Sequence, residues 1–166
     1  MSTRLERETQ VRAKGGLHLT FKLGDETYGI EILKVQEIMG MLTVTPLPRT
    51  PDYMRGVINL RGKVIPVIDL RLKFAMEAHD YTRRTCIIVV QVQLERVALV
   101  MGIIVDEVSE VIEVAAEQIE PPPSFGTEVD TEFILGIGKV GNKVMMLLDV
   151  DRVLTGEELS VVTQAA

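Results

Sequence analysis

Apolar and polar residues alternate along the first part of the chain in the manner of short, half-buried strands. Residues 17–23 (LHLTFKL) and 26–32 (ETYGIEI) show this pattern, and the turn signal Gly24-Asp25 separates them. We therefore predict a β-hairpin here. Residues 33–39 (LKVQEIM) are compatible with a strand or with a short helix. A proline cluster then interrupts regular structure, at Pro46, Pro48 and Pro51.

Runs of β-branched and aliphatic residues dominate the rest of the chain and favour strands. Two of them, residues 56–60 and 63–70, flank Arg61-Gly62 and predict a hairpin, after which Asp69 can cap a short helix over residues 70–74. Further strands are predicted over residues 85–94, 97–105, 106–114, 133–140 and 143–150. The last two form a hairpin around Gly141-Asn142. Thr155 followed by Glu158 has the spacing of a capping box, so we expect a C-terminal helix.

The two strongest hairpins are similar in sequence. Residues 56–74 align without gaps on residues 136–154, so that Gly56 corresponds to Gly136 and Asp69 to Asp149. Both contain an apolar strand, a turn, a second apolar strand and an aspartate-led helix. Two interpretations are open: the chain contains two related small barrels, or any two hairpin–helix units look this much alike. Many short strands in each half fit small closed barrels.

Composition narrows the possible partners. The 166 residues carry a net charge of −6, with 46% hydrophobic residues, no tryptophan and few aromatics, so the core must be aliphatic. An acidic chain is unsuited to nucleic acid or to anionic membrane surfaces, which attract clustered lysine and arginine. The longest apolar run, residues 97–105, is too short to span a bilayer. With one cysteine and no apolar signal region, the expected location is the cytoplasm.

Candidate catalytic groups are few. His18 lies in an alternating strand and is expected to face solvent, His79 lies in a polar segment, and Cys86 is interpreted as a small buried hydrophobe. Residues 136–141 spell GxGxxG, but an apolar strand follows them instead of the helix that a dinucleotide site requires. The carboxylates Asp106, Glu107 and Glu110 alternate with valines and are interpreted as a solvated face. We predict a non-enzymatic protein without cofactor or metal.

Protein-interaction surface is the remaining interpretation. Phe125 follows three prolines, and an aromatic residue on a stiffened loop loses little entropy on binding. The alternative, with Phe125 tucked into its own core, is equally open. Arg61 lies at a hairpin tip where the repeat has Gly141, so the turn does not need an arginine. Its guanidinium could pair with Glu37 or hold a partner backbone. If residues 33–39 form a strand, Val35 and Glu37 share one side of it.

Four motifs, in this order and spacing, resemble the bacterial chemotaxis coupling family CheW: FKLGDETYGIEILKVQEI, PDYMRGVINLRGKVIPVIDLR, GIIVDEVSEV and ILGIGKVGNKVMMLLDVDRVL. The resemblance runs from Leu17 to the C-terminal helix. It implies an all-β fold with short helices, made of two small five-stranded β-barrel subdomains that share a hydrophobic core. It also divides the chain into a flexible tail over residues 1–16 and a domain over residues 17–160. The expected subdomains are residues 17–84, with the C-terminal helix, and residues 85–150.

Function and site residues follow from the same resemblance. Members of the family couple cytoplasmic tips of chemoreceptors to the regulatory domain of the histidine kinase CheA, in arrays at the inner face of the membrane. The expected receptor-binding residues are Val35, Glu37, Arg61, Val108 and Val111. The expected kinase-binding residues are Glu120, Ser124 and Phe125. The alternatives are a CheW-like regulatory module of another two-component pathway and, with less support, a small-ligand-binding β-barrel.

Overall fold

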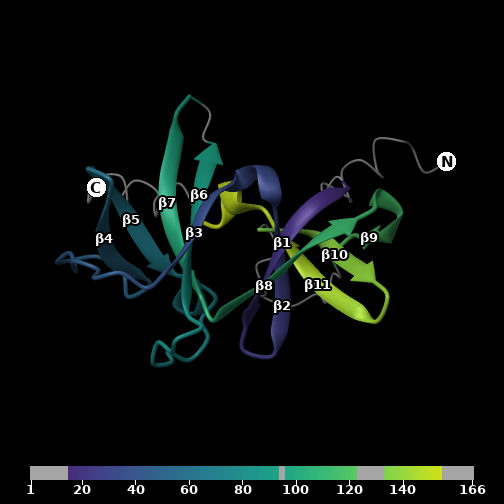
Figure 1. Ribbon diagram of the computed structural model, residues 1–166, viewed down its shortest axis with the longest axis horizontal. Helices are drawn as coiled ribbons and strands as arrows, with labels where there is room; N and C mark the ends of the chain where they lie inside the picture. The colour runs from purple at the N-terminus through teal and green to yellow at the C-terminus, as the bar shows by residue number, and fades with distance from the viewer. Residues whose placement is uncertain (1–14, 94–95, 123–132, 155–166) are drawn as a thin grey trace.

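The computed structural model describes residues 15–93, 96–122 and 133–154. This part of the chain is made of strands joined by short turns, with the short helix α2 and three single 3-10 turns (Figure 1). The strands are β1 (Gly16–Leu23), β2 (Glu26–Glu31), β3 (Val35–Gly40), β4 (Met54–Leu60), β5 (Lys63–Asp69), β6 (Cys86–Gln93), β7 (Ala98–Val105), β8 (Glu107–Val114), β9 (Ile119–Glu120), β10 (Ile134–Val140) and β11 (Lys143–Leu148). The helical segments are η1 (Ile32–Lys34), α2 (Leu70–Lys73), η2 (Ala116–Gln118) and η3 (Val150–Arg152).

The strands form two sheets. Sheet A has the order β8-β1-β2-β11-β10-β9, and sheet B has the order β3-β6-β7-β5-β4. Sheet A therefore combines strands from the beginning and the end of the described chain, whereas sheet B uses the middle. The expected boundary at residues 84 and 85 does not coincide with this division, because β6 and β7 pair with β3 and β5. The chain crosses from sheet B to sheet A between β7 and β8.

Buried side chains form three clusters, and their distribution follows the two-residue period of the strands. In β6, Ile88 and Val90 belong to a central cluster that both sheets share, while Ile87 and Val89 point into sheet B's own cluster. Sheet A has a smaller cluster of its own, built from Val114, Ile119, Met145 and Leu147. The predicted all-β fold, with two small subdomains and a shared core, is confirmed.

Strand β1 shows why sheet A's own cluster is small. Its alternation suggested one solvated face, yet His18, Leu19, Thr20 and Phe21 are all buried. Leu19 and Phe21 belong to the central cluster. Because side chains alternate along a strand, His18 and Thr20 lie on the other face of sheet A. The expectation that His18 faces solvent was therefore wrong. Its ring Nδ1 lies 2.9 Å from the carbonyl oxygen of Gly16, which satisfies one polar atom in this buried position.

The internal repeat is structural. Both hairpins carry a β-bulge at the same place, between Met54 and Gly56 in β4 and between Ile134 and Gly136 in β10. The aspartates after them also match. The amide of Asp69 donates to the Tyr53 carbonyl at 2.7 Å, and that of Asp149 donates to the Phe133 carbonyl at 2.8 Å. Asp69 caps α2 as predicted, accepting from the amide of Leu72. The interpretation of two related units is thus the better one.

Two expectations lie outside the described residues. The flexible tail was assigned to residues 1–16, of which the structure describes Gly15 and Gly16, and Gly16 already belongs to β1. The capping box of the C-terminal helix, Thr155 and Glu158, falls in residues 155–166. Both expectations stay predictions.

Candidate functional site

Arg61 holds an unfavourable backbone conformation at the tip of the β4–β5 hairpin. Its φ is +51°, and that of Gly62 is +86°. Two successive positive φ angles define the hairpin turn whose twist matches the flanking strands. Glycine adopts this region freely, but an arginine pays for the close approach of its Cβ to the backbone. In the matching hairpin the first turn position is Gly141, with φ +61°. The turn geometry alone therefore does not explain the arginine.

The guanidinium of Arg61 binds the carboxylate of Glu37 through two donors. Its Nη1 lies 3.2 Å from Oε1, and its Nη2 contacts Oε2. The hydrogen bonds that the guanidinium donates to the Glu37 carboxylate, and then the charge of that carboxylate, raise the pKa of Arg61 above its ordinary value. The arginine is the outer member, because 72% of its side chain is exposed against 27% for Glu37. Of the two roles expected for the guanidinium, pairing with Glu37 is the one that the structure contains, and the pair presents a cation to solvent.

Glu37 belongs to β3, the edge strand of sheet B. Of the two structures expected for residues 33–39, a strand or a short helix, residues 35–39 form the strand. The 3-10 turn η1 occupies residues 32–34. A bulge between Val35 and Glu37 shifts the register, so the two residues do not share one side of the strand as expected: Val35 lies opposite Val90 of the central cluster, and Glu37 lies opposite Val89 of sheet B's own cluster. Exposure alternates along the strand: Val35 and Glu37 are half-buried, and Ile38 is exposed. Val35 packs against the central cluster.

Val108 and Val111 lie on β8, the edge strand of sheet A. Val108 packs against the central cluster, whereas Val111 is exposed. A bulge separates them: the two steps from Leu19 to Phe21 along β1 span the three steps from Val111 to Val108 along β8. The hydroxyl of Thr20 fills this bulge. It donates to the carbonyl of Glu110 at 2.6 Å and accepts from the amide of Glu110 at 3.1 Å.

Replacing Thr20 with valine is expected to lower the free energy of unfolding by about 1–2 kcal/mol. Valine has the same shape, but it leaves the amide and carbonyl of Glu110 without their partner in the bulge. Urea denaturation measures the change. Thr27→Val is the control, since Thr27 lies on the adjacent strand β2 and is partly exposed. Equal losses for both variants would contradict the role given to the Thr20 hydroxyl.

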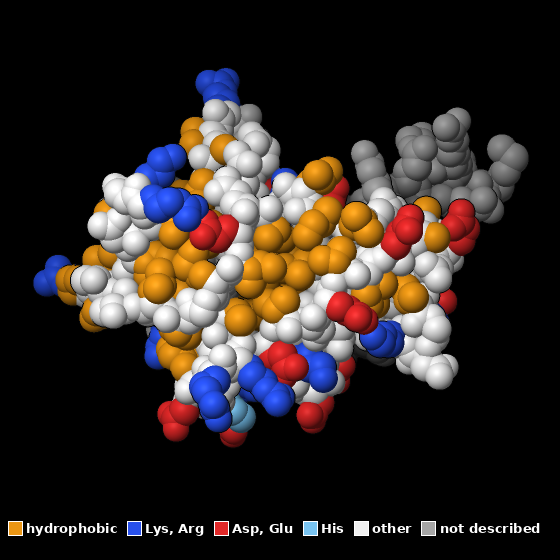
Figure 2. All heavy atoms as spheres, viewed as in Figure 1, with side chains coloured by type: hydrophobic (Ala, Val, Ile, Leu, Met, Phe, Trp, Pro, Cys, Tyr) orange, Lys and Arg blue, Asp and Glu red, His pale blue; other side chains and the backbone are white. Residues whose placement is uncertain are grey.

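Apolar side chains gather in the middle of the face that contains these strands. Figure 2 shows a continuous apolar area there, over the region in which Figure 1 places β3, β1 and β8. The exposed or half-buried apolar residues of the two edge strands are Val35, Ile38, Met39, Val108, Val111 and Ile112. Acidic side chains next to basic ones adjoin this area on both sides in the figure. An apolar centre with a charged rim is typical of protein-interaction surfaces.

The residues expected to bind the kinase lie apart from this face in the strand order. Glu120 belongs to β9, at the opposite end of sheet A from β8. Its carboxylate accepts from the ammonium of Lys139 at 3.0 Å, and both side chains are largely exposed. Ser124 and Phe125 fall within residues 123–132, outside the described residues. Their role stays a prediction.

One cluster was missed from the sequence. Asp106, interpreted as part of a solvated face, lies where the chain crosses from β7 to β8 and accepts from three donors. These are Nε of Arg71 at 2.6 Å, Nη2 of Arg71 at 2.5 Å and the amide of Gly24 at 2.7 Å. Burial raises the pKa of Asp106, but the hydrogen bonds from Arg71 and Gly24 and nearby positive charge outweigh it and lower the pKa. A carboxylate after a buried strand offered no signal that distinguished it from its solvated neighbours.

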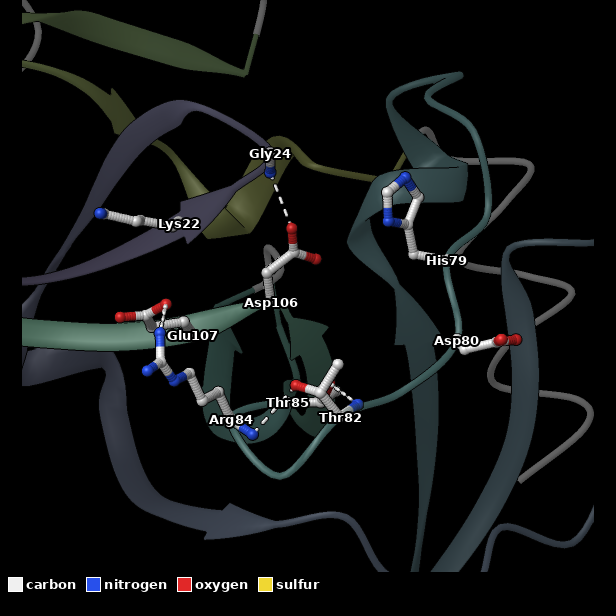
Figure 3. A pocket seen from close by; sticks show the side chains of 9 residues that line it. All are labelled: Lys22, Gly24, His79, Asp80, Thr82, Arg84, Thr85, Asp106 and Glu107. Carbon is white, nitrogen blue, oxygen red and sulfur yellow. Dashed lines mark hydrogen bonds and ion pairs between the residues drawn. The ribbon is translucent and has the colours of Figure 1, made fainter.

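The pocket beside Asp106 lacks polar groups that converge on a ligand. Figure 3 shows its lining residues bound to one another: Asp106 accepts from the amide of Gly24, Glu107 pairs with Arg84, and the hydroxyl of Thr85 accepts from the amide of Thr82. Positive and negative groups alternate around it, so no single ligand charge is favoured. Among the described residues, no group of three histidine, cysteine or acidic side chains could hold a metal ion. The glycines of residues 136–141 lie in β10 and its turn, and strand β11 follows them, as predicted.

No helix in the described ranges is long and apolar enough to cross a membrane. The described part of the molecule has an apolar face with an ion pair, and the Asp106 carboxylate is engaged by Arg71 and Gly24. Such a face is suited to binding another protein.

Known proteins share this architecture. Residues 17–158 match the CheW-like domain family. The chain is 45% identical over 148 residues to the chemotaxis protein CheW of Klebsiella aerogenes, covering 89% of this chain and 87% of that protein. It is 36% identical over 145 residues to CheW of Rhizobium meliloti, covering 87% and 91%. The crystal structure of the scaffolding protein TtCheW from Thermoanaerobacter tengcongensis has a TM-score of 0.77 and 35% identity, covering 87% of this chain and 95% of that one.

The family match covers 142 of the 166 residues (17 to 158 inclusive). The relative from Klebsiella aerogenes is well above 30% identical and is covered over most of its length, so the family of this chain is clear. The chain belongs to the CheW family and is a chemotaxis adaptor.

Proposed function

We propose that this adaptor couples the cytoplasmic tips of chemoreceptors to the regulatory domain of the histidine kinase CheA. The observation that carries the proposal is the Arg61–Glu37 pair, whose glutamate lies on β3 between the apolar residues Val35 and Ile38. An arginine at positive φ is a local cost that the turn does not require. Strained residues persist where the surroundings hold them, and they gather at functional positions. The exposed guanidinium fits a partner that offers carboxylates or backbone carbonyls.

The proposed receptor site consists of Val35, Glu37 and Arg61 on sheet B and Val108 and Val111 on sheet A. The valines supply apolar area, and the ion pair supplies orientation. Because the site spans both sheets, a partner bound across it is sensitive to their relative position. A receptor whose signalling states bind it with different free energies would then shift the kinase between states. A difference of about 1–3 kcal/mol is the usual size of such coupling.

The proposed kinase site is at the other end of sheet A, around Glu120, Ser124 and Phe125. Placing the two partners on different edges lets one molecule bind both at once. The role proposed here is to bring proteins together, without catalysis, and we place the adaptor in the cytoplasm within receptor arrays at the membrane's inner face. Attraction between charged surfaces adds mainly to the association rate and to specificity.

Replacing Arg61 with glycine is expected to separate function from folding. Glycine accommodates φ +51° without strain, so the melting temperature should stay the same or rise. Affinity for a receptor cytoplasmic fragment should fall about tenfold, because arginine anchors contribute disproportionately to interfaces. Affinity for the CheA regulatory domain should stay within twofold. Isothermal titration calorimetry with each partner measures both affinities.

Lys63→Ala is the matched control, since it removes an exposed cation two residues away on the same hairpin. It should leave both affinities within twofold. Wild-type receptor affinity in Arg61→Gly would remove Arg61 from the site. Absence of wild-type binding to either partner would reject the proposed function itself.

A further inference from the structure

Five of the six strands of sheet A are arranged like the five strands of sheet B, although the chain visits them in a different order. In sheet A, Thr20 of β1 pairs with Gly29 of β2, and Gly29 pairs in parallel with Leu147 of β11. In sheet B, Val89 of β6 pairs with Gly102 of β7, and Gly102 pairs in parallel with Val67 of β5. The order β8-β1-β2-β11-β10 thus corresponds to β3-β6-β7-β5-β4. The edge strand β8 is the counterpart of the edge strand β3.

These two edge strands match residue by residue. Residues 35–39 read VQEIM, and residues 108–112 read VSEVI. Each carries a bulge after its valine, so that three steps on the edge strand span two on its neighbour. The first valine of each packs against the central cluster, and the fourth residue, Ile38 or Val111, is exposed. Met39 and Ile112 pack against the separate clusters of their own sheets. Glu110 therefore occupies the position of Glu37.

Each glutamate also pairs with a cation from the matching hairpin, although the two cations occupy different positions in it, since the repeat aligns Arg61 with Gly141 and Lys143 with Lys63. Glu37 binds Arg61 from the β4–β5 hairpin, and Glu110 binds the ammonium of Lys143 from the β10–β11 hairpin, its counterpart in the repeat. In both pairs the cation is the more exposed member: 72% against 27% for Arg61 and Glu37, and 61% against 52% for Lys143 and Glu110. Both sheets thus present a cation that is bound to a glutamate of their apolar edge strand, β3 or β8.

We propose that Lys143 and Glu110 form a second anchoring pair of the receptor site, equivalent to Arg61 and Glu37. This inference rests on the proposed function and extends the site to two matched halves. The partner that fits is an amphipathic helical segment with an apolar stripe and carboxylates on both flanks. The stripe covers the valines and Ile38, and the carboxylates meet Arg61 at one side and Lys143 at the other.

Two features favour a helix over an added strand. Bulges on β3 and β8 interrupt the regular row of amides and carbonyls that strand addition requires. An open hollow also lies beside Glu110 and Lys143, with Thr20, Thr27 and Ile112 in its lining. It gives a side chain of the partner room to reach the pair, while the apolar stripe stays on the edge strands.

The test uses the full chain and calorimetric titration with a receptor cytoplasmic fragment and, separately, with the CheA regulatory domain. Lys143→Ala should weaken receptor binding about fivefold and reduce its dependence on salt, because a cation facing carboxylates is removed. Lys143→Arg should keep wild-type affinity. The control is Lys139→Ala, which breaks a similarly exposed lysine–glutamate pair in β10 and β9. It should leave receptor affinity within twofold. Arg61→Ala combined with Lys143→Ala should lose the product of the two single factors.

Wild-type receptor affinity in Lys143→Ala, beside a weakened Arg61→Ala, would overturn the second anchoring pair and leave the proposed function standing. A loss of kinase binding with receptor binding intact would also overturn it, by assigning this half to the other partner. Equal losses in Lys143→Ala and Lys143→Arg at unchanged melting temperature would show that charge is not the property recognised. A wild-type chain that binds no receptor fragment is the distinct failure of the function itself.

Discussion

Replacing Asp106 with asparagine is expected to lower the free energy of unfolding by about 2–3 kcal/mol, measured by urea denaturation. The carboxylate joins three parts of the molecule: α2 through Arg71, the β1–β2 turn through the amide of Gly24, and the crossing between the sheets. Only 10% of the Arg71 side chain is exposed. Asparagine removes the carboxylate that pairs with this nearly buried guanidinium and leaves it the hydrogen bond to the Glu77 carbonyl at 3.2 Å and the attraction of Asp69 and Glu77, so the loss exceeds that of an exposed pair.

The adjacent residue supplies the control. Glu107 makes an ion pair with Arg84 at 3.7 Å, and Arg84 is largely exposed. Glu107→Gln should change stability by less than about 0.5 kcal/mol. If Asp106→Asn and Glu107→Gln cost the same small amount, the crossing between the sheets does not depend on the Asp106 ion pair.

Acid sensitivity provides a second readout for Asp106. Its pKa in the folded protein lies below its ordinary value of 3.8. The ion pair therefore stabilises the fold fully above that ordinary value, and this contribution is lost as the pH falls through the lower folded-state pKa. The stability difference between wild type and Asp106→Asn should be constant near neutral pH and shrink below about pH 4. A difference that grows on acidification would contradict the assigned shift.

Replacing Gly56 with alanine is expected to be the most damaging small substitution, with a loss of about 3–5 kcal/mol. Gly56 has φ +141°, a conformation that residues with a side chain rarely adopt. A Cβ there would overlap the Thr45 carbonyl oxygen and lie 2.6 Å from its carbonyl carbon. This backbone cannot retreat, because Thr45 and Val57 exchange two hydrogen bonds of 2.9 Å. Thermal and urea unfolding measure the loss.

Gly40→Ala is the control, since a Cβ at that position meets nothing within 4 Å. It should change stability by less than about 0.5 kcal/mol. Gly136→Ala is the counterpart in the repeat, where the added Cβ would lie 2.8 Å from the Glu120 carbonyl oxygen. Its loss should be smaller than that of Gly56→Ala, because Gly136 lacks the positive φ. If Gly56→Ala left stability unchanged, the bridge between Thr45 and Val57 would be able to open at little cost in free energy.

The two ion pairs on the apolar face and the one at the crossing have different roles. Arg61–Glu37 and Lys143–Glu110 are exposed, so solvent screens them and they add little to folding. In the proposed function, they orient a partner. Arg71–Asp106 is partly buried and connects the sheets, so it belongs to the fold. A variant that weakens binding without changing stability therefore distinguishes the first kind from the second.

The sequence by itself determined the elements and much of the site. Short apolar runs with period two specified the strands, and Gly-containing turns specified both strong hairpins, because these signals depend on neighbouring residues only. The repeat between residues 56–74 and 136–154 was visible for the same reason, and it isolated Arg61 as the residue without a structural explanation. The pairing of Arg61 with Glu37 was one of the two roles that the sequence offered for this arginine.

The tertiary structure decided which strands share a sheet and which polar residues are buried. The boundary expected at residue 84 failed because pairing of β6 with β3 is long-range and leaves no local mark. His18 and Thr20 look like solvated positions, yet both are buried, on the side of β1 opposite to Leu19 and Phe21 of the central cluster. Asp106 and Glu107 are indistinguishable in sequence, and only the approach of Arg71 and Gly24 makes the first structural. The match between β3 and β8 likewise required the registers, because its five residues are too few to be noticed before both strands are placed at equivalent edges.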